Sequence, residues 1–299
     1  MPRHSGRGAL LILVAALFWS TGGLFIKSIS LDGFGISFWR SALAALTLFI
    51  AYRIFVPANT RHASRWTHPD TIVTALVYAG LLVLFVMATK LTTSANAIFL
   101  QFTAPIYVLI AEPIVSKTKI KQADIIAVFI TIGAMILFFV GKFEGGAVLG
   151  NILALTSGVC FAAYTILLKH ARFGEEGRWH SVILGHVLIC AAMAGLAIAG
   201  ITSIRPNGIE DIGMLAFLGI LQIGIPYTFF TIGIRDVKAL DALLLSMLEP
   251  VLNPVWVFIG IGERPSNWAI LGGSIIIAVV IIRSYLTIGK RREEVIPDH

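Results

Sequence analysis

Glu249 is the one acidic residue near the centre of a long apolar stretch in this 299-residue chain. A carboxylate in such surroundings is costly unless it is hydrogen-bonded, protonated or paired. It could anchor one helix to another, bind the amine of a ligand, or carry a proton. The pattern favours the anchor and leaves the other two roles open.

Arg40, Glu112 and His186 are further ionisable residues within apolar stretches. Arg40 is expected either to extend its long side chain outward to the membrane surface or to pair with Glu263. Glu112 and His186 are expected to serve structure first.

Trp19 lies near the middle of the first apolar stretch, too deep for the tryptophan belts that form at membrane interfaces. With the hydroxyls of Ser20 and Thr21 beside it, this position predicts the wall of an aromatic, ligand-binding cavity. Gly22 and Gly23 follow, and they predict close packing of helix backbones. Further polar, aromatic or sulfur-containing side chains at depth are predicted to line the same cavity together with Glu249. They are Tyr78, Asn96, Phe99, Gln101, Phe102, Phe161, Tyr164, Gln222, Tyr227, Met247 and Asn253.

Pro105, Pro250 and Pro254 interrupt two of the apolar stretches. Proline removes a backbone hydrogen bond and kinks a helix, and the freed carbonyls are tolerated only inside protein or beside water. We therefore expect kinks or hinges at these prolines. Interrupted helices at corresponding places in the two halves of a chain point to a binding site.

Signatures of enzymes are missing from the sequence. The carboxylates are scattered, with no DxxD pair at a helix end, no HExxH motif and no GxxxxGK[ST] loop. Cys160 and Cys190 both fall in apolar runs, where packing explains them better than a disulfide or a metal site. We expect no catalysis, no metal, no cofactor and no ATP hydrolysis.

The composition is that of an integral membrane protein. The chain is 57% hydrophobic and 13% charged, with a mean hydropathy of +0.89, whereas charged residues make up about 25% of soluble domains. The net charge of +7 comes from short basic blocks between apolar runs, which orient a membrane protein rather than bind nucleic acid.

Apolar segments of about 20 residues, the length that crosses a bilayer as a helix, recur along the chain. They predict ten transmembrane helices, at 8–27, 34–52, 71–89, 94–116, 123–141, 147–168, 180–200, 212–234, 240–261 and 267–288. If the N-terminus is cytoplasmic, most Lys and Arg residues lie in inner connections. The outer connections then hold only Lys27, Lys90, Lys142, Arg205 and Arg264. This asymmetry predicts that both termini face the cytoplasm.

The two halves of the chain align with each other. At an offset of 142, Lys27 meets Lys169, and at an offset of 145 residues 85–105 align without a gap with residues 230–250. Five spans per half is an odd number, so the two copies must cross the membrane in opposite senses. We predict an all-α fold made of two inverted five-helix repeats, at 8–141 and 147–288, followed by a cytoplasmic tail at 289–299.

The quoted residues resemble a known family. "LFWSTGGLFIK" (17–27) is similar to the first-helix signature of the drug/metabolite transporter superfamily, EamA type, and "LEPVLNPVWVFIGIGERPSNWAILGGSIIIAVVII" (248–282) is similar to its ninth and tenth helices. The first half departs from the pattern. Ala104 stands where a glutamate would precede Pro105, and Lys117 and Thr118 stand where a Gly-Glu pair would be.

The resemblance implies a multi-pass protein of the bacterial cytoplasmic membrane that exports small molecules by alternating access. An aromatic cavity with scattered hydrogen-bonding groups suits amphipathic substrates, and aromatic or other neutral amino acids are the leading expectation. The chain is most similar overall to the YddG-type exporters of aromatic amino acids. Other metabolites or drugs, such as nucleosides, are the alternative within the family, and an intramembrane enzyme is the weakest alternative.

Overall fold

Helices form all of the regular structure in the part of the chain that the computed structural model describes, which comprises residues 5–62, 65–138, 140, 147–170, 174–261 and 266–295. The helices up to residue 138 are α1 (Ser5–Trp19), α2 (Gly22–Ser28), α3 (Gly33–Phe55), the short η1 (Ala58–Thr60), α4 (Pro69–Leu91), α5 (Ser94–Gln101), α6 (Ala104–Ser116) and α7 (Gln122–Phe138). Those from residue 148 are α8 (Val148–Lys169), α9 (Gly174–Ile198), α10 (Ile209–Ala216), the π-helical η3 (Phe217–Gly224), α11 (Ile225–Gly233), α12 (Ala239–Ser246), α13 (Leu248–Ile261) and α14 (Asn267–Val295).

Seven helical segments in the described ranges are long and apolar enough to cross a membrane. They are Gly33–Phe55, Pro69–Leu91, Ser94–Ser116, Val148–Lys169, Gly174–Ile198, Ile209–Gly233 and Asn267–Leu286. The spans expected at 8–27, 123–141 and 240–261 are not among the seven, although two shorter apolar helices, Gly6–Trp19 and Gln122–Leu137, fall in the first two. The chain is therefore a multi-pass membrane protein, and the count of ten stays a prediction.

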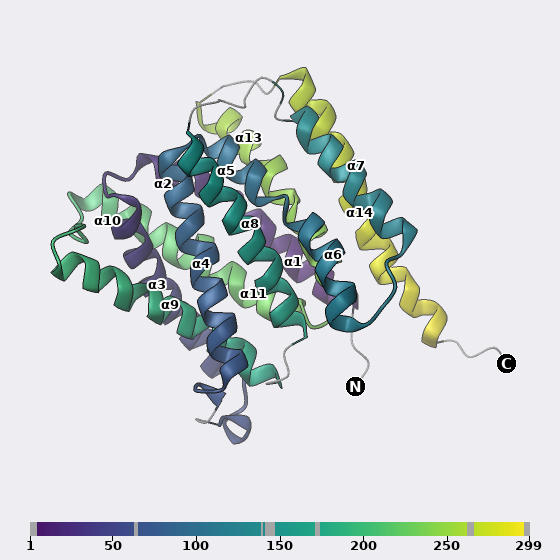
Figure 1. The fold of residues 1–299 in the computed structure, drawn as a ribbon, viewed down its shortest axis with the longest axis horizontal. Coiled ribbons are helices and arrows are strands. Elements are labelled where there is room, and N and C mark those ends of the chain that lie inside the picture. The colour runs from purple at the N-terminus through teal and green to yellow at the C-terminus, as the bar shows by residue number, and fades with distance from the viewer. Residues whose placement is uncertain are drawn as a thin grey trace.

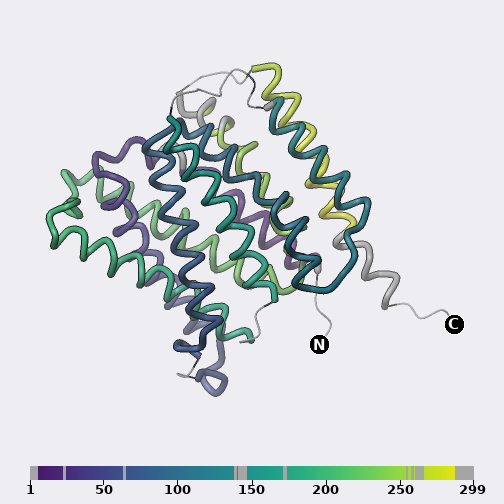
Figure 2. The backbone as a smooth tube through the Cα atoms, in the orientation of Figure 1, coloured from purple at the N-terminus to yellow at the C-terminus, as the bar shows by residue number. Residues whose placement is uncertain are grey.

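The helices pack so that the middle of the bundle draws on both halves of the chain. In Figure 1, α4, α8, α1 and α11 occupy the middle, while α3, α9 and α10 lie on one flank. α4 packs against α8 and α9, α1 packs against α11, and α3 packs against α9 and η3. α7 and α14 pair along the opposite edge of the bundle, as the tube in Figure 2 also shows.

Three helical stretches are interrupted part of the way along. The first breaks between Trp19 and Gly22, and the second breaks at Phe102 and Thr103, just before Pro105 in the first turn of α6. A third break, at Met247, separates α12 from α13, whose first turn contains Pro250. The span predicted at 8–27 thus contains two helices, α1 and α2, and at the break between them two hydroxyl residues bond back to the preceding turn.

Two lysines make equivalent contacts in the two halves. Lys27, near the end of α2, donates from Nζ to the carbonyl oxygen of Thr92, between α4 and α5, over 2.7 Å. Lys169, at the end of α8, donates to the carbonyl oxygen of Arg235, between α11 and α12, over 2.8 Å. The sequence offset that aligned these lysines therefore has a counterpart in their contacts.

Two glycines make a second pair of equivalent contacts, now between the halves. A Cβ atom built on Gly150 of α8 would lie 2.8 Å from the backbone carbonyl carbon of Leu91, which ends α4. One built on Gly8 of α1 would lie 2.7 Å from the carbonyl oxygen of Gly233, which ends α11. Only glycine allows these approaches, so the first helix of each half packs closely on the other half.

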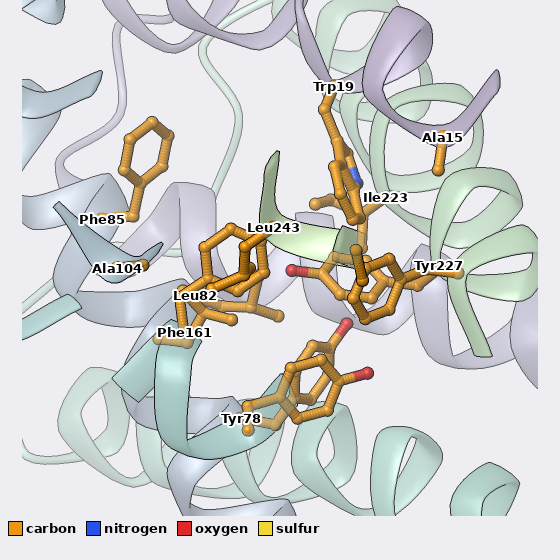
Figure 3. Packing of buried hydrophobic residues seen from close by; sticks show 14 of the residues in the cluster. Ala15, Trp19, Tyr78, Leu82, Phe85, Ala104, Phe161, Ile223, Tyr227 and Leu243 are labelled. Carbon is orange, nitrogen blue, oxygen red and sulfur yellow. The ribbon is translucent and has the colours of Figure 1, made fainter. Parts of the chain in front are cut away.

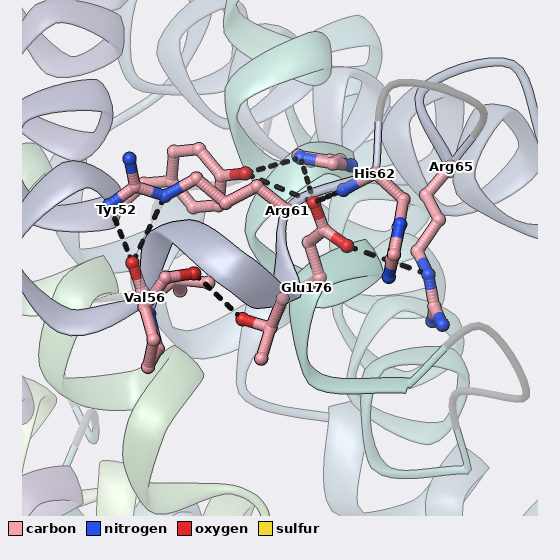
Figure 4. Close-up of polar contacts among 9 residues, drawn as sticks. Tyr52, Val56, Arg61, His62, Arg65 and Glu176 are labelled. Atoms are coloured by element: carbon pink, nitrogen blue, oxygen red, sulfur yellow. Dashed lines mark hydrogen bonds and ion pairs between the residues drawn. The ribbon is translucent and has the colours of Figure 1, made fainter.

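A buried carboxylate fastens the connection after α3 to the start of α9. Glu176 accepts hydrogen bonds from the hydroxyl of Tyr52 at 3.1 Å and from the backbone N–H of His62 at 2.5 Å (Figure 4). Arg65 and His180 lie 3.5 Å from the same carboxylate. This cluster holds the end of α3 in place. The same helix carries Arg40 nearer its beginning.

Candidate functional site

Aromatic rings from both halves meet in the middle of the bundle (Figure 3). The ring of Trp19 lies 6.2 Å from that of Phe161 in an edge-on geometry, 4.8 Å from that of Tyr227 and 5.4 Å from that of Phe230, measured between centroids. Such spacings are those of favourable aromatic pairs. α1, α8 and α11 are thereby joined through their rings.

A second group of rings continues this aromatic cluster. The Tyr78 ring lies 4.8 Å from that of Tyr227 and 4.7 Å from that of Tyr164. The Tyr78 hydroxyl and His186 Nε2 are 3.0 Å apart, so this phenol has a hydrogen-bond partner on α9. His186 is therefore structural in this arrangement, as expected.

A small cavity of about 30 Å³ lies beside these rings. Its wall combines apolar side chains with four that can hydrogen-bond through charged or amide groups. It is lined by Trp19, Arg40, Leu81, Leu82, Phe85, Gln101, Phe161, Gln222, Ile223, Tyr227 and Glu249. This volume is about that of one water molecule, so the cavity must enlarge before it can hold a metabolite.

Gln222 organises the polar side of the cavity. Its Oε1 atom accepts a hydrogen bond of 2.8 Å from Nη2 of Arg40, and its Nε2 atom donates to the carbonyl oxygen of Trp19 over 3.2 Å. Because α1 ends at Trp19, Gln222 bonds to the last carbonyl of that helix. A Cβ atom at Gly22 would collide with the Gln222 side chain, so glycine is required there for this contact.

The π-helical segment η3 places Gln222 and Ile223 on the cavity wall. A π-helix adds a residue to the turn and is frequent at functional sites. It re-aims the side chains of η3 relative to the α-helices on either side of it. The sequence analysis did not foresee this segment.

The hydroxyl groups of the two residues after Trp19 form hydrogen bonds at the break between α1 and α2. Ser20 Oγ donates to the carbonyl of Leu17 at 2.6 Å, and Thr21 Oγ1 donates to that of Phe18 at 2.7 Å. Ser20 also receives a hydrogen bond from Nε1 of Trp256 at 2.7 Å, and its carbonyl accepts one from Asn253 at 3.0 Å. These bonds tie the broken first helix to α13.

The structure thus divides the predicted binding residues into three groups. Those on the cavity wall are Trp19, Gln101, Phe161, Gln222, Tyr227 and Glu249. Those that support the wall through ring contacts, hydrogen bonds at the break or burial are Ser20, Thr21, Tyr78, Phe102, Tyr164, Met247 and Asn253. Those outside both groups are Asn96, which bonds with Thr92 and Asn151, and Phe99, which packs against the core.

Arg40 is the main cavity residue that the sequence analysis did not place there. Its side chain is 4% exposed and turns inward to Gln222, so the expectation that it extends to the membrane surface was wrong. The alternative partner, Glu263, lies outside the described residues. The signal available in the sequence was a charged residue within an apolar span. The direction in which the Arg40 side chain points depends on Gln222 of η3, a segment that the sequence analysis did not foresee.

Metal chemistry finds no support at this site. Among the residues that the structure describes, no group of three or more His, Cys, Asp or Glu side chains is placed to hold a metal ion. The cavity offers one carboxylate, one guanidinium, two amides and aromatic rings. Such a set can bind and orient a small molecule.

Comparison with known proteins agrees with a transport role. The model of the EamA-like transporter family matches residues 6–140 and 148–285, which is one match in each half. An uncharacterized transporter of Archaeoglobus fulgidus is 25% identical over 302 residues, covering 95% of this chain and 98% of the relative. The uncharacterized transporter YwfM of Bacillus subtilis is 27% identical, with 87% of this chain and 88% of the relative covered.

A human relative and a solved structure extend the comparison. Solute carrier family 35 member G1 of Homo sapiens is 23% identical, covering 91% of this chain and 77% of the relative. A solved crystal structure, whose title does not name the protein, has the same fold with a TM-score of 0.77. The two sequences are 20% identical, and the match covers 96% of this chain and 99% of the other. The chain belongs to the EamA-like transporter family, and it is a membrane transporter rather than an enzyme.

Proposed function

We propose that this transporter exports small amphipathic metabolites, with aromatic and other neutral amino acids as its substrates. The observation that carries the proposal is the central cavity, whose wall joins Trp19, Phe161 and Tyr227 to the polar groups of Gln222 and Glu249. Rings bind the apolar body of such a solute, and a few placed polar groups fix its orientation.

The cavity draws on both halves of the chain. α1, α3, α4 and α5 contribute from the first half, and α8, η3, α11 and α13 contribute from the second. A site at the boundary between two repeats is where alternating-access transporters hold their substrate. Relative movement of the halves would then expose the same wall to one face of the membrane and afterwards to the other.

We further propose that the repeats are inverted, with five spans at 8–141, five at 147–288, a tail at 289–299, and both termini in the cytoplasm. The equivalent lysine contacts of Lys27 and Lys169 support this arrangement, as do the equivalent glycine approaches. The beginning of α1 and the end of α14 also lie toward the same side of the bundle in Figure 1.

The three helix breaks are the proposed hinges. Pockets that hold small ligands measure about 300–1,000 Å³, so the 30 Å³ cavity must widen to admit one. Pro105, Pro250 and Pro254 lie in the first two turns after two of the breaks. Movement about these points would enlarge the cavity without unfolding any helix.

Reconstitution into liposomes tests the proposal. Uptake of radiolabelled amino acids and nucleosides is measured with and without a pH gradient. The variant Trp19→Ala, which lacks the central aromatic ring, is measured in parallel with the unaltered protein. We expect saturable movement of aromatic amino acids that is weakened in the variant. If the folded protein moves nucleosides and no amino acid, the substrate assignment is wrong.

Glu249 allows the energy source to be tested in the same vesicles. If Glu249→Gln keeps exchange of labelled for unlabelled substrate but loses uptake driven by a pH gradient, the carboxylate couples transport to protons. If both activities survive, Glu249 anchors helices or orients substrate.

A further inference from the structure

Arg40 is a buried cation whose hydrogen-bonding capacity is mostly unused. Its side chain is 4% exposed, and its one hydrogen bond runs from Nη2 to Gln222 over 2.8 Å. Nε and Nη1 have no hydrogen-bond partner among the described residues. Guanidinium groups carry five N–H donors, and leaving them unpaired in a buried site is costly.

Protein groups nearby do not supply the missing partners. Glu249 lines the same cavity and is close enough to Arg40 for an electrostatic interaction, but within the described part of the chain the two side chains form no ion pair. The acceptor oxygen of Gln222 already receives Nη2 of Arg40, and its amide nitrogen is a donor, which cannot pair with another N–H group. The Nε1–H group of Trp19 has no partner there either. Two residues that line this cavity therefore carry unused donors.

The geometry points to a carboxylate as the missing ligand. The guanidinium fork matches a carboxylate through two parallel hydrogen bonds, which are among the stronger ones in proteins. Trp19 would add a third donor. On the same wall, the acidic side chain of Glu249 suits an ammonium group, and Phe161 and Tyr227 suit an apolar body.

We propose that Arg40 binds the carboxylate of the transported molecule while Glu249 faces its amino group, so that the site selects zwitterions with an aromatic side chain. This inference rests on the proposed transport of amino acids and names how the cavity recognises them. Arg40 is thus a specificity residue, and Gln222 holds its guanidinium in place while the site is empty.

Three probes that share one ring separate the two charges: L-phenylalanine carries both, phenethylamine lacks the carboxylate, and 3-phenylpropionate lacks the amine. Each is measured by the rise that it causes in the unfolding temperature of the purified protein, and by competition with labelled phenylalanine in liposomes. For the unaltered protein we expect phenethylamine to bind roughly 10- to 100-fold more weakly than phenylalanine, as the loss of charge-assisted hydrogen bonds predicts.

Arg40→Gln should remove this discrimination by weakening phenylalanine and 3-phenylpropionate while leaving phenethylamine unchanged. Arg40→Lys keeps the charge without the fork and should give an intermediate result. Arg205→Gln removes a cation from an exposed connection and is the matched control. If Arg40→Gln weakens all three probes equally, or if the unaltered protein binds phenethylamine as well as phenylalanine, the assignment is wrong.

The two readouts keep the two proposals apart. Binding that discriminates between the probes, without any movement of amino acids in liposomes, would overturn the proposed transport and leave the role of Arg40 standing. If phenylalanine moves but its binding does not depend on its carboxylate, the role of Arg40 is refuted and the proposed transport stands. The probe series on the unaltered protein gives this answer even if the Arg40 variants do not fold.

Discussion

Glu112 connects α6, in the first half of the protein, to the start of α12, in the second half. Its carboxylate lies near the end of α6 and accepts hydrogen bonds from the backbone N–H groups of Ala239 at 3.2 Å and Leu240 at 3.3 Å. These are the first two residues of α12, whose own N-cap residue, Lys238, provides no side-chain cap. A carboxylate from a distant helix therefore caps α12.

The effect of removing this carboxylate can be worked out from the two contacts. Loss of an N-cap costs about 0.5–2 kcal/mol, and loss of a negative charge at a helix N-terminus costs about 0.3–1 kcal/mol more. Glu112→Ala should thus weaken the first turn of α12 by about 1–3 kcal/mol, a factor of roughly 5 to 150 in its opening equilibrium. Hydrogen–deuterium exchange of the amides in Ala239–Ser246 measures that opening directly.

Two variants isolate the cause. Glu112→Gln keeps an oxygen that accepts the same hydrogen bonds, so it should lose only the smaller, charge-dependent part. Glu210→Ala removes an exposed acid from the first turn of another helix, α10, and should leave exchange in α12 unchanged. Exchange of α12 in Glu112→Ala at the rate of the unaltered protein would refute the reasoning.

Three further substitutions probe backbone strain, helix approach and a charged cluster. Lys117 ends α6 with a positive φ of 54°, so Lys117→Gly should raise the unfolding free energy by about 0.5–1 kcal/mol in detergent denaturation, and a fall would show that the lysine side chain matters more than the strain. Gly158→Ala would place a Cβ atom 2.7 Å from the carbonyl oxygen of Gln101, so it should lower the unfolding temperature by several degrees, with Gly195→Ala on an open surface as control. Arg283 bonds to two carboxylates, including that of Asp241 at 3.1 Å, so Arg283→Met should destabilise the protein by about 3–5 kcal/mol, a loss that disappears if both acids are neutralised as well.

Much of the site could be predicted because depth in an apolar stretch is readable from sequence. Trp19, Phe161 and Tyr227 combine depth with aromatic rings, and they meet on one cavity wall. Two of the helix breaks lie just before Pro105 and Pro250, where the missing backbone N–H of proline weakens the helix. Both signals depend on a residue and its close neighbours in the chain.

The features that escaped prediction depend on contacts between distant helices. The break after Trp19 has no proline, and it is held by side chains of α13 and η3 more than 200 residues away. Arg40 turns inward because Gln222 lies opposite it, and Gln222 is presented by a π-helical segment without a sequence signature. A lone charge in an apolar span therefore indicates that the residue has a polar interaction, but it does not identify the partner.

The glycine contacts at Gly8 and Gly150 have a consequence for biosynthesis. Each half places its first helix against the other, since α1 packs on α11 and α8 packs on α4. While the first half emerges from the ribosome, the surface of α4 that α8 later covers must face lipid or a chaperone. The two halves are thus interlocked as they mature, and the last helices to be inserted complete the packing of the first.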